Sequence, residues 1–370
     1  MRLLQINKLY HPWIGGVEEV VRNIAEGLND RVKVRVLVCQ PKGRGTRETV
    51  NGVEVFRAGS IGIYSSMPVS FSFPFLLGKL SKDADILHFH LPFPLATLSY
   101  LLVRPKGKVV VWWHSDIVRQ KNMMRLYRPF LTAFLKKVDK IMIATAEHIE
   151  SSRFLGAFRD KCEIVPFGID VAWLCPSHET REEAAKIREK YGSQIVLFVG
   201  RLIYYKGVEY LIRAMKDVSA RLLIVGQGAL ENRLRALTAE LQLGDRVVFL
   251  GRVADERMPA YYHSCDVFVL PSIACSETFG IVQLEAMACG KPVVNTDLPT
   301  GVPRVSRNGE TGITVPPADS AALTAAINRL LRDSDFRQTC GRNARKRVET
   351  YFTAPRMIED IYRVYEKVLG

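Results

Sequence analysis

Short apolar runs alternate along the whole chain with longer segments in which apolar residues recur every three or four positions. The runs are mostly continuous and rich in β-branched residues, as expected of strands covered on both faces of a sheet. We expect strands at residues 3–7, 32–38, 86–89, 109–113, 140–144, 195–199, 222–225, 246–250, 267–270 and 292–295. The segments between them are predicted helices, one with apolar residues at Val17, Val20, Val21, Ile24 and Leu28. Strands alternating with helices predict parallel α/β sheets.

Residues 165–170 (VPFGID) follow the fifth strand, and we interpret them as a linker between two domains. A length of 370 residues also fits two domains. The expected fold is α/β, with two doubly wound, Rossmann-like domains at 1–168 and 169–352 facing across a central cleft. A last helix is predicted near 356–369, and we expect residues 353–370 to pack back on the first domain. Ligands of such folds bind at the carboxyl ends of the strands.

One uncharged stretch, residues 86–103, is long enough to be mistaken for a membrane-spanning helix. It contains His88, His90, Pro92 and Pro94, and because prolines interrupt helices we expect a strand, a turn and a helix instead. The seven cysteines are odd in number and lack Cys-x-x-Cys spacing. They indicate a cytosolic protein with reduced thiols, without a disulfide framework or a structural zinc site.

The formal net charge is +14, and most of the excess lies in the first 168 residues. Residues 119–140 hold seven basic residues and one acidic residue, with apolar residues at helical spacing between them. Such an amphipathic helix could bind an anionic membrane surface or an anionic substrate. It could equally be a domain helix with a solvated basic face. Nucleic acid is a weaker explanation, since no binding motif accompanies the charge.

Several motifs that define other chemistry are absent from the sequence. Gly226-Gln227-Gly228 follows a predicted strand, but Glu231 stands where a dinucleotide fingerprint needs its third glycine. No Walker A, Gly-x-Ser-x-Gly or His-Glu-x-x-His sequence occurs. Asp333-Ser334-Asp335 lies between two predicted helices, and we interpret it as a helix N-cap rather than a metal site.

Two predicted loops have features that suit a phosphate group. Gly15 and Gly16 precede a predicted helix, and glycines there allow a phosphate to approach the helix N-terminus, although a tight turn would explain them equally well. The strand at 195–199 continues into GRLIYYKG, which places Arg201 and Lys206 at the carboxyl end of a strand. Two cations there suit a diphosphate, and the alternative is a pair of solvated loop cations.

The most distinctive segment is SETFGIVQLEAMACGKPVV, residues 276–294. Glu277 precedes a helix predicted from about residue 280 to 289, and Glu285 lies inside that helix among apolar residues. A buried carboxylate needs a partner, and sugar hydroxyls are suitable donors. The alternative makes Glu277 a helix-dipole residue and Glu285 a solvated surface residue.

Glu277 and Glu285 at this spacing, together with GRLIYYKG, VGQG and the early glycine pair, resemble the family 4 retaining glycosyltransferases, which have the GT-B fold. Further motifs follow in the family's order: DILHFHLP, WWHSD, VPFGID and GETGITVPPAD. The resemblance covers nearly the whole chain, and the combination of motifs is highly specific.

The resemblance implies roles for residues of the second domain. Arg201 and Lys206 would bind the donor diphosphate, Glu285 would grip the ribose hydroxyls, and Glu277 would hold hydroxyls of the donor sugar. Further donor contacts are implied for the amides of Phe279, Gly280 and Ile281 and, in the nucleobase loop, for Val253.

In the first domain, the resemblance places His114 beneath the donor sugar and amides near Gly15 and Gly16 opposite the phosphates. Asp116 is expected to line the acceptor side. The catalytic set implied across the chain is His114, Glu277, Arg201 and Lys206.

The implied reaction transfers a hexose from a nucleoside diphosphate sugar to a hydroxyl, with retention of the α configuration. No metal or other cofactor is expected, because Arg201 and Lys206 would neutralise the leaving diphosphate. The family offers no settled nucleophile, and its usual account is a front-face path in which the departing phosphate helps deprotonate the acceptor. Domain closure would expel water, the competing acceptor.

We expect GDP-mannose as the donor, with UDP-hexoses and UDP-N-acetylhexosamines as alternatives. Residues 298–303 (LPTGVP) are similar to bacterial O-antigen mannosyl- and related transferases, whereas SIACSETFG departs from the commoner form before Glu277. The basic first domain suits a polyprenyl diphosphate-linked saccharide acceptor of lipopolysaccharide-type synthesis and a peripheral position on the anionic inner face of the plasma membrane. A GT-B-like sugar-nucleotide epimerase should lack the acidic pair with GRLIYYKG, and no nucleic acid partner is expected.

Overall fold

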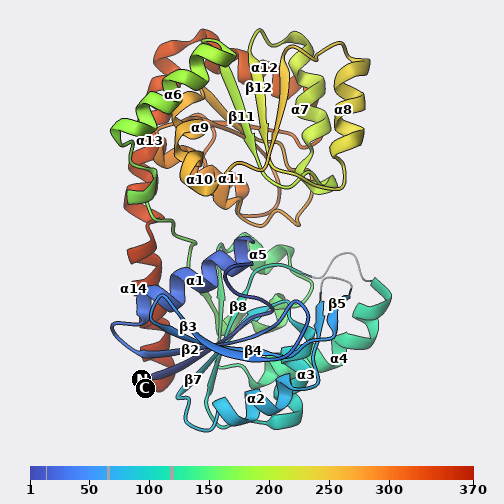
Figure 1. The fold of residues 1–370 in the computed structure, drawn as a ribbon, viewed down its shortest axis with the longest axis vertical. Helices are drawn as coiled ribbons and strands as arrows, with labels where there is room; N and C mark the ends of the chain where they lie inside the picture. The colour runs from blue at the N-terminus through green and yellow to red at the C-terminus, as the bar shows by residue number, and fades with distance from the viewer. Residues whose placement is uncertain (14, 65–66, 117–120) are drawn as a thin grey trace. The chain divides into compact units, whose positions relative to one another are not determined.

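The computed structural model describes residues 1–13, 15–64, 67–116 and 121–370, and the chain forms two compact units. Unit 1 consists of Met1–Phe167 and Ala354–Gly370, and unit 2 consists of Gly168–Thr353 (Figure 1). The chain therefore passes from unit 1 to unit 2 once within residues 165–170 and returns once at the start of its last helix.

Unit 1 is built on an eight-stranded sheet with the order β10-β9-β8-β7-β1-β2-β4-β3. Its neighbours pair in parallel except for the edge strand β3, which is antiparallel to β4. The strands are β1 (Arg2–Ile6), β2 (Lys33–Cys39), β3 (Thr46–Val50), β4 (Val53–Ala58), β7 (Ile86–Leu91), β8 (Lys108–Trp113), β9 (Lys140–Ile143) and β10 (Cys162–Ile164). A separate hairpin pairs β5 (Gly62–Tyr64) with β6 (Met67–Val69).

Helices cover both faces of this sheet. On one face α14 (Ala354–Leu369) packs against α1 (Gly16–Leu28), so that the end of the chain completes unit 1 (Figure 1). On the other face α2 (Phe73–Leu80), α3 (Pro94–Val103) and α4 (Lys121–Lys137) pack side by side over a continuous apolar core. The short α5 (Glu147–Ser151) and the 3-10 segment η1 (Leu155–Lys161) precede β10.

Unit 2 is built on six parallel strands with the order β13-β12-β11-β14-β15-β16. The strands are β11 (Ile195–Val199), β12 (Arg221–Val225), β13 (Val247–Gly251), β14 (Val267–Leu270), β15 (Val293–Thr296) and β16 (Gly312–Val315). The order reverses between β11 and β14, and ligands of open parallel sheets bind at such a switch point.

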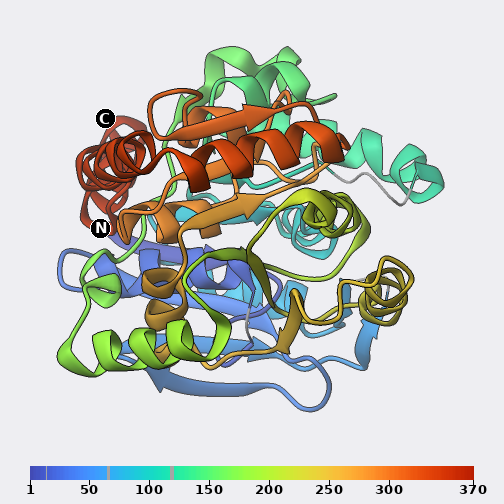
Figure 2. The ribbon, with the colours of Figure 1, turned by 90° about the horizontal axis from the view of Figure 1, so that it is seen from above.

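The helices of unit 2 lie on both faces of its sheet (Figure 2). One layer shares an apolar core with the strands and consists of α7 (Val208–Ala214), α8 (Glu231–Glu240) and α12 (Ser320–Arg332). The other helices are α6 (His178–Tyr191), α9 (Met258–Ser264), α10 (Ile281–Ala288), α11 (Val302–Val305) and α13 (Ser334–Tyr351). Single 3-10 turns occur at η2 (Ala172–Leu174), η3 (Tyr204–Lys206), η4 (Met215–Asp217) and η5 (Asp255–Arg257).

All ten predicted strands are present, and residues 86–103 form β7, a turn and α3 as expected. Asp333 caps α13 by accepting a hydrogen bond from the amide of Phe336 at 2.9 Å, which confirms the N-cap interpretation. The prediction omitted β3, β4, β5, β6, β10 and β16. Within the part of the chain that the structure describes, no helix is both long and apolar enough to cross a bilayer.

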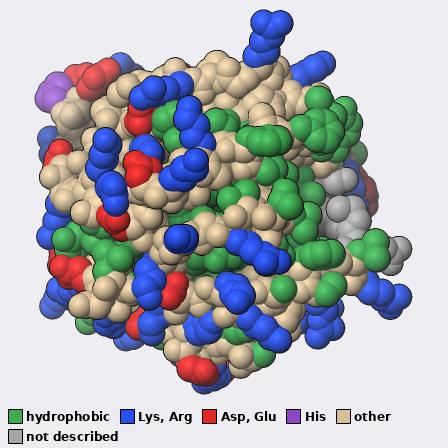
Figure 3. Space-filling model, turned by 90° about the horizontal axis from the view of Figure 1, so that it is seen from below, with side chains coloured by type: hydrophobic (Ala, Val, Ile, Leu, Met, Phe, Trp, Pro, Cys, Tyr) green, Lys and Arg blue, Asp and Glu red, His purple; other side chains and the backbone are tan. Residues whose placement is uncertain are grey.

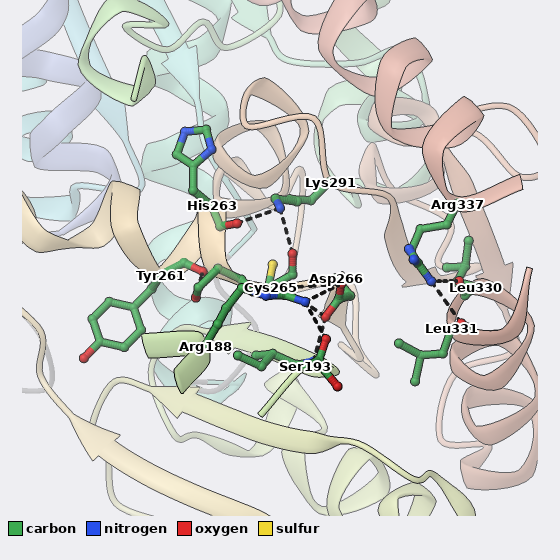
Figure 4. A network of polar contacts seen from close by, with 12 residues as sticks. Arg188, Ser193, Tyr261, His263, Cys265, Asp266, Lys291, Leu330, Leu331 and Arg337 are labelled. Carbon is green, nitrogen blue, oxygen red and sulfur yellow. Dashed lines mark hydrogen bonds and ion pairs between the residues drawn. The ribbon is translucent and has the colours of Figure 1, made fainter. Parts of the chain in front are cut away.

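Lys291, from the distinctive segment at 276–294, has a structural role (Figure 4). Its Nζ donates to the carbonyl oxygens of His263 and Cys265 at 2.8 and 2.7 Å. Arg188 donates to the neighbouring Ser264 carbonyl at 2.6 Å. Cations are favoured where a helix ends with exposed carbonyls, so the two side chains fix the C-terminus of α9.

Candidate functional site

The loops that follow β11 and β14 meet at the carboxyl edge of the unit 2 sheet. The two strands are neighbours at the switch point, so both loops leave the same edge. The first loop carries Arg201 and Lys206, and the second carries Glu277. The amide of Ile273 donates to the carbonyl of Tyr205 at 2.8 Å, which joins the loops directly.

Lys206 and Glu277 form an almost buried ion pair where these loops meet. Lys206 Nζ lies 2.6 Å from Glu277 Oε2, and each side chain is only 10% exposed. The hydroxyl of Ser272 donates to the same carboxylate oxygen at 2.9 Å, which helps to offset the desolvation of the pair. Arg201 is exposed and donates to the Tyr205 hydroxyl at 3.3 Å. The interpretation of the loop cations as solvated is therefore wrong for Lys206.

Glycines set the path of these loops. Gly207 has a φ of +62°, and a Cβ at this position would lie 2.1 Å from the carbonyl oxygen of Pro271. A Cβ on Gly226, in the VGQG motif, would lie 2.1 Å from the carbonyl oxygen of Gly200. Both glycines allow neighbouring loops to approach more closely than any other residue would permit. VGQG therefore has a packing role beside the Arg201–Lys206 loop.

The N-terminus of α10 lies on the same edge. Gly280 is its N-cap residue with a φ of +73°, Phe279 before it is buried, and Ile281 begins the helix. Below them Gln283 is fully buried and donates to the carbonyl of Phe279 at 2.7 Å. The Gln283 amide oxygen in turn accepts a hydrogen bond from Asn295 at 3.2 Å. This buried network, absent from the sequence prediction, fixes the start of the helix in place.

Glu285 lies one turn inside α10 and is half-buried. Its Oε2 accepts a hydrogen bond from the hydroxyl of Tyr262, a fully buried residue of α9. Burial raises the pKa of Tyr262 well above its ordinary value, and the Glu285 charge adds to this, so the phenol remains a donor. The interpretation of Glu285 as a solvated surface residue is therefore wrong, and Tyr262 joins the candidate site.

Val253 lies in the loop after β13 and is half-buried. Gly251 ends β13 with a φ of +66°, and its carbonyl accepts a hydrogen bond from the amide of Gly226 at 2.7 Å. The Gly251–Val253 loop thus adjoins the VGQG loop, at the same edge of the unit 2 sheet as Arg201 and Lys206.

In unit 1 the glycine pair stands at the start of α1. Gly15 is the N-cap residue, and Gly16, the first helical residue, has no heavy atom within 4 Å of where its Cβ would be. The preceding loop is held by Arg57, a buried residue of β4 that donates to the carbonyls of Tyr10 and His11. The sequence prediction missed Arg57 because it lies in an unpredicted strand.

His114 belongs to a chain of buried polar rings on the α14 face of the unit 1 sheet. Its Nε2 lies 3.0 Å from His90 Nδ1, and His90 Nε2 lies 3.2 Å from Gln5 Oε1. An amide oxygen only accepts, so His90 donates from Nε2 and accepts at Nδ1. His114 is thereby held with its proton on Nε2 and its Nδ1 unprotonated. Tyr365 of α14 joins this cluster through His88, with its hydroxyl 2.7 Å from His88 Nδ1.

Acidification is expected to destabilise unit 1. Burial lowers the pKa of His88 and of His114 to about 3, and burial also lowers the pKa of His90 well below its ordinary value. Below about pH 6.5 the unfolded chain binds protons that the folded chain does not. The stability that these neutral histidines contribute is therefore fully present above about pH 6.5, and the free energy of unfolding decreases as the pH falls below it.

Each histidine lowers the free energy of unfolding by up to about 1.4 kcal/mol for every pH unit below its unfolded-state pKa. Urea unfolding followed by tryptophan fluorescence at pH 7.5 and pH 5 measures this, because three of the four tryptophans, Trp13, Trp112 and Trp113, lie in unit 1. A free energy of unfolding that is equal at the two pH values would contradict the neutral, buried histidines.

Asp116 is held by donors within unit 1. Its carboxylate accepts hydrogen bonds from Trp113 Nε1 at 3.0 Å, Ser152 Oγ at 2.7 Å and the Arg153 amide at 3.0 Å. These contacts tie the end of β8 to the segment after α5 and give Asp116 a clear structural role. That Asp116 lines the side of the site where the acceptor binds stays a prediction.

Comparison with known proteins places this chain in a family. Residues 14–173 match the family described as Glycosyltransferase Family 4, and residues 179–347 match Glycosyl transferases group 1. The whole chain is 32% identical to O-antigen chain mannosyltransferase C of Escherichia coli, of which it covers 99%. Identity to D-rhamnosyltransferase WbpZ of Pseudomonas aeruginosa is 34%, covering 96% of this chain and 93% of that protein.

A solved structure has the same fold. HepE of Anabaena in complex with UDP-glucose matches with a TM-score of 0.81 at 20% identity, covering 99% of this chain and 100% of that one. The two Rossmann-like sheets, together with this match, give the chain the GT-B fold of glycosyltransferases. The chain belongs to the family 4 glycosyltransferases, and it is a hexosyltransferase.

Proposed function

We propose that this enzyme moves a hexose from a nucleoside diphosphate sugar to a hydroxyl of a lipid-linked saccharide, with retention of the α configuration. The observation that carries the proposal is the Lys206–Glu277 ion pair, with Arg201 on the same loop, at the switch point of the unit 2 sheet. A cation and a carboxylate fixed side by side suit a ligand whose phosphate and sugar hydroxyls are adjacent.

In this proposal unit 2 holds the donor. Lys206 and Arg201 bind the diphosphate, Glu277 accepts hydrogen bonds from the sugar, and Glu285 accepts them from the ribose diol. The sugar also lies near the amides of Phe279, Gly280 and Ile281, and the base lies near Val253. The burial of the ion pair supports these roles, because charges act more strongly where water is excluded.

Unit 1 contributes His114, Gly15 and Gly16 to the reaction and binds the acceptor. Burial keeps the His114 imidazole neutral, so its unprotonated Nδ1 can accept a hydrogen bond from a hydroxyl of the donor sugar. The exposed amide end of α1 at Gly16 suits phosphate oxygens.

The bond from the anomeric carbon to the diphosphate oxygen breaks, and a bond to the acceptor oxygen forms on the same face of the sugar. The acceptor hydroxyl proton passes to the departing phosphate, so no protein base is needed in that step. Arg201 and Lys206 stabilise the negative charge that develops on the leaving group. A divalent metal is not part of the proposal, because these two cations supply the neutralisation.

GDP-mannose is the proposed donor, supported by the mannosyltransferase among the relatives, and a UDP-hexose or UDP-N-acetylhexosamine is the alternative. The proposed acceptor is a polyprenyl diphosphate saccharide of O-antigen-type lipopolysaccharide synthesis, and the O-antigen chain in the name of the Escherichia coli relative supports the second part of this proposal. We place the enzyme in the cytoplasm on the anionic inner face of the plasma membrane. The basic face of α4 supports this position, although Arg119 of the predicted segment lies outside the described residues.

Replacing Tyr262 with phenylalanine is expected to raise KM for the donor about tenfold while kcat changes little. The change removes a hydrogen bond to a charged carboxylate, worth about 1.5–3 kcal/mol, and loosens Glu285 rather than the reacting atoms. Steady-state kinetics with varied donor measures the effect, and Tyr261→Phe on the same helix is the control. A loss confined to kcat would show that Tyr262 does not act through ribose binding.

A thermal-shift panel of GDP, UDP, dTDP and their sugar conjugates, with and without EDTA, tests the proposed function. A ligand that binds only the folded state raises the unfolding midpoint, so the correct nucleotide stands out. We expect GDP and GDP-mannose to stabilise the enzyme equally in both conditions. Stabilisation by UDP alone would make a UDP-sugar the donor in place of GDP-mannose. No response to any nucleotide would overturn the proposed donor site.

A further inference from the structure

A second group of cations lies at the carboxyl edge of the unit 2 sheet, beside the ends of β15 and β16. A cavity of about 600 Å³ opens there, and three arginines line it: Arg304 of α11, Arg307 after that helix, and Arg347 of α13. The sheet order places β16 three strands from β11, which is about 14 Å at the usual spacing of neighbouring strands. The cavity is therefore separate from the Arg201–Lys206 loop.

Arg347 is fixed in place by its surroundings. Its Nε and Nη2 atoms donate to the carbonyl oxygens of Val305 and Arg304 at 2.9 and 2.8 Å. Its guanidinium also lies 5.4 Å from the ring centroids of Tyr351 and Phe352. A guanidinium has five N–H donors, and both of these hydrogen bonds go to neutral carbonyls rather than to a carboxylate. Arg347 is thus preorganised while its positive charge still favours an anionic ligand.

The positive charges at the cavity repel one another. Burial lowers the pKa of Arg347, and the charge of Arg307 adds to this, whereas Glu310 opposes it. Arg307 and Glu310 are paired at 3.3 Å, but both side chains are about half exposed, and exposed pairs of this kind are weak. An anion between the arginines relieves the repulsion, and phosphate oxygens match the fork of a guanidinium.

Two further polar groups of the cavity suit a sugar. The side-chain oxygen of Asn308 accepts a hydrogen bond from the amide of Thr314 at 3.1 Å, which leaves the Asn308 NH2 group to donate. Asp297 follows β15, and its exposed carboxylate accepts hydrogen bonds from hydroxyls. This carboxylate repels a free phosphate, whereas a phosphate attached to a sugar brings hydroxyls for it. The lining therefore matches a sugar phosphate better than inorganic phosphate.

The cavity differs from the general basicity of the chain. Figure 3 shows Lys and Arg side chains scattered over the lower side of the molecule among hydrophobic and other groups. Cations that are solvated one by one do not define a ligand. In the cavity, three guanidinium groups line one volume of a size that ligand pockets have.

We propose that this cavity binds a saccharide phosphate, with its three arginines on the phosphate and Asp297 on a sugar hydroxyl. Two sources share this chemistry. One is the phosphate of the lipid-linked acceptor, which rests on the proposed function, and the other is a soluble sugar phosphate. Binding in the cavity does not depend on the donor that unit 2 takes.

Isothermal titration calorimetry of the full chain with mannose 1-phosphate tests the proposal, in saturating GDP so that the donor site is occupied. We expect the wild type to bind mannose 1-phosphate at least tenfold more tightly than inorganic phosphate. Arg304→Gln/Arg307→Gln should weaken binding of mannose 1-phosphate at least tenfold. Arg347→Lys keeps the charge but loses the fork, and it should weaken binding severalfold. Asp297→Ala should remove the preference over inorganic phosphate.

The matched control is Arg332→Gln/Arg342→Gln, which removes the same charge from two exposed arginines of unit 2 outside the cavity. It should bind like the wild type, and urea unfolding checks that each variant folds. No binding by the wild type, equal binding by wild type and cavity variant, or equal losses in cavity and control variants would overturn the proposal. Inorganic phosphate bound as tightly as mannose 1-phosphate would overturn its saccharide part.

Initial rates with a membrane extract as the acceptor separate the two sources. We expect Arg304→Gln/Arg307→Gln to need at least tenfold more extract for half-maximal rate, with KM for the donor unchanged. Loss of mannose 1-phosphate binding without this change in rate would assign the cavity to a soluble sugar phosphate. Binding that depends on the arginines, in an enzyme that responds to no nucleotide, would preserve the cavity site and overturn the proposed donor site.

Discussion

Replacing Lys206 with methionine is expected to lower kcat/KM for the donor by about 10³-fold, since one preorganised group on developing negative charge is worth about 10²–10³ in rate. The same change leaves Glu277 almost buried without its cation. Breaking such a pair by removing one partner costs about 3–5 kcal/mol of unfolding free energy. Lys206→Met should therefore lose both activity and stability.

The double variant Lys206→Met/Glu277→Gln separates these two effects. It removes both buried charges, so we expect it to recover most of the lost stability while activity stays at or below that of Lys206→Met. Urea unfolding and initial-rate kinetics on the same preparations measure the two quantities. The control is Lys216→Met, at an exposed lysine of unit 2. Activity that returns together with stability would make the ion pair purely structural.

Replacing Gly207 with alanine is expected to destabilise unit 2 by about 3 kcal/mol or more. The residue has a φ of +62°, and its new Cβ would lie 2.1 Å from the Pro271 carbonyl oxygen. Relief requires the loops after β11 and β14 to separate, which also moves Lys206 from Glu277. The measurement is the unfolding midpoint in urea. Gly244→Ala is the control, because Gly244 has no neighbour within 4 Å of a Cβ and lacks a positive φ. Equal midpoints for the two variants would contradict the close approach.

Much of the fold could be predicted because buried parallel strands give continuous apolar runs. The strands that were missed lack this signal. β3 reads Thr-Arg-Glu-Thr-Val and is an exposed edge strand, and β16 has only four residues, two of them half-buried. β4 alternates buried and half-buried residues, so that its apolar run is broken by Glu54 and Arg57. Pattern alone does not distinguish such segments from loops.

The candidate site could also be predicted from the sequence only in part. Arg201, Lys206, Glu277 and Glu285 could be named from their motifs, but the contact between Lys206 and Glu277 depends on β11 and β14 being neighbours, which no local spacing encodes. Tyr262 reads as an ordinary core aromatic, and its role depends on how α9 packs beside α10. In unit 1 the contact between Gln5 and His90 was not predicted. It depends on β1 and β7 being neighbours in the sheet with these two side chains on the same face.

The most direct test of the account is the configuration of the sugar that the enzyme transfers. The enzyme would be incubated in EDTA with GDP-mannose and a membrane extract rich in lipid-linked saccharides. NMR of the purified product would then give the anomeric configuration of the new linkage. We expect an α-linked mannose and release of one GDP for each sugar transferred. A β-linked product, a requirement for divalent metal, or no transfer from any nucleotide sugar would contradict retaining transfer supported by Arg201, Lys206 and Glu277.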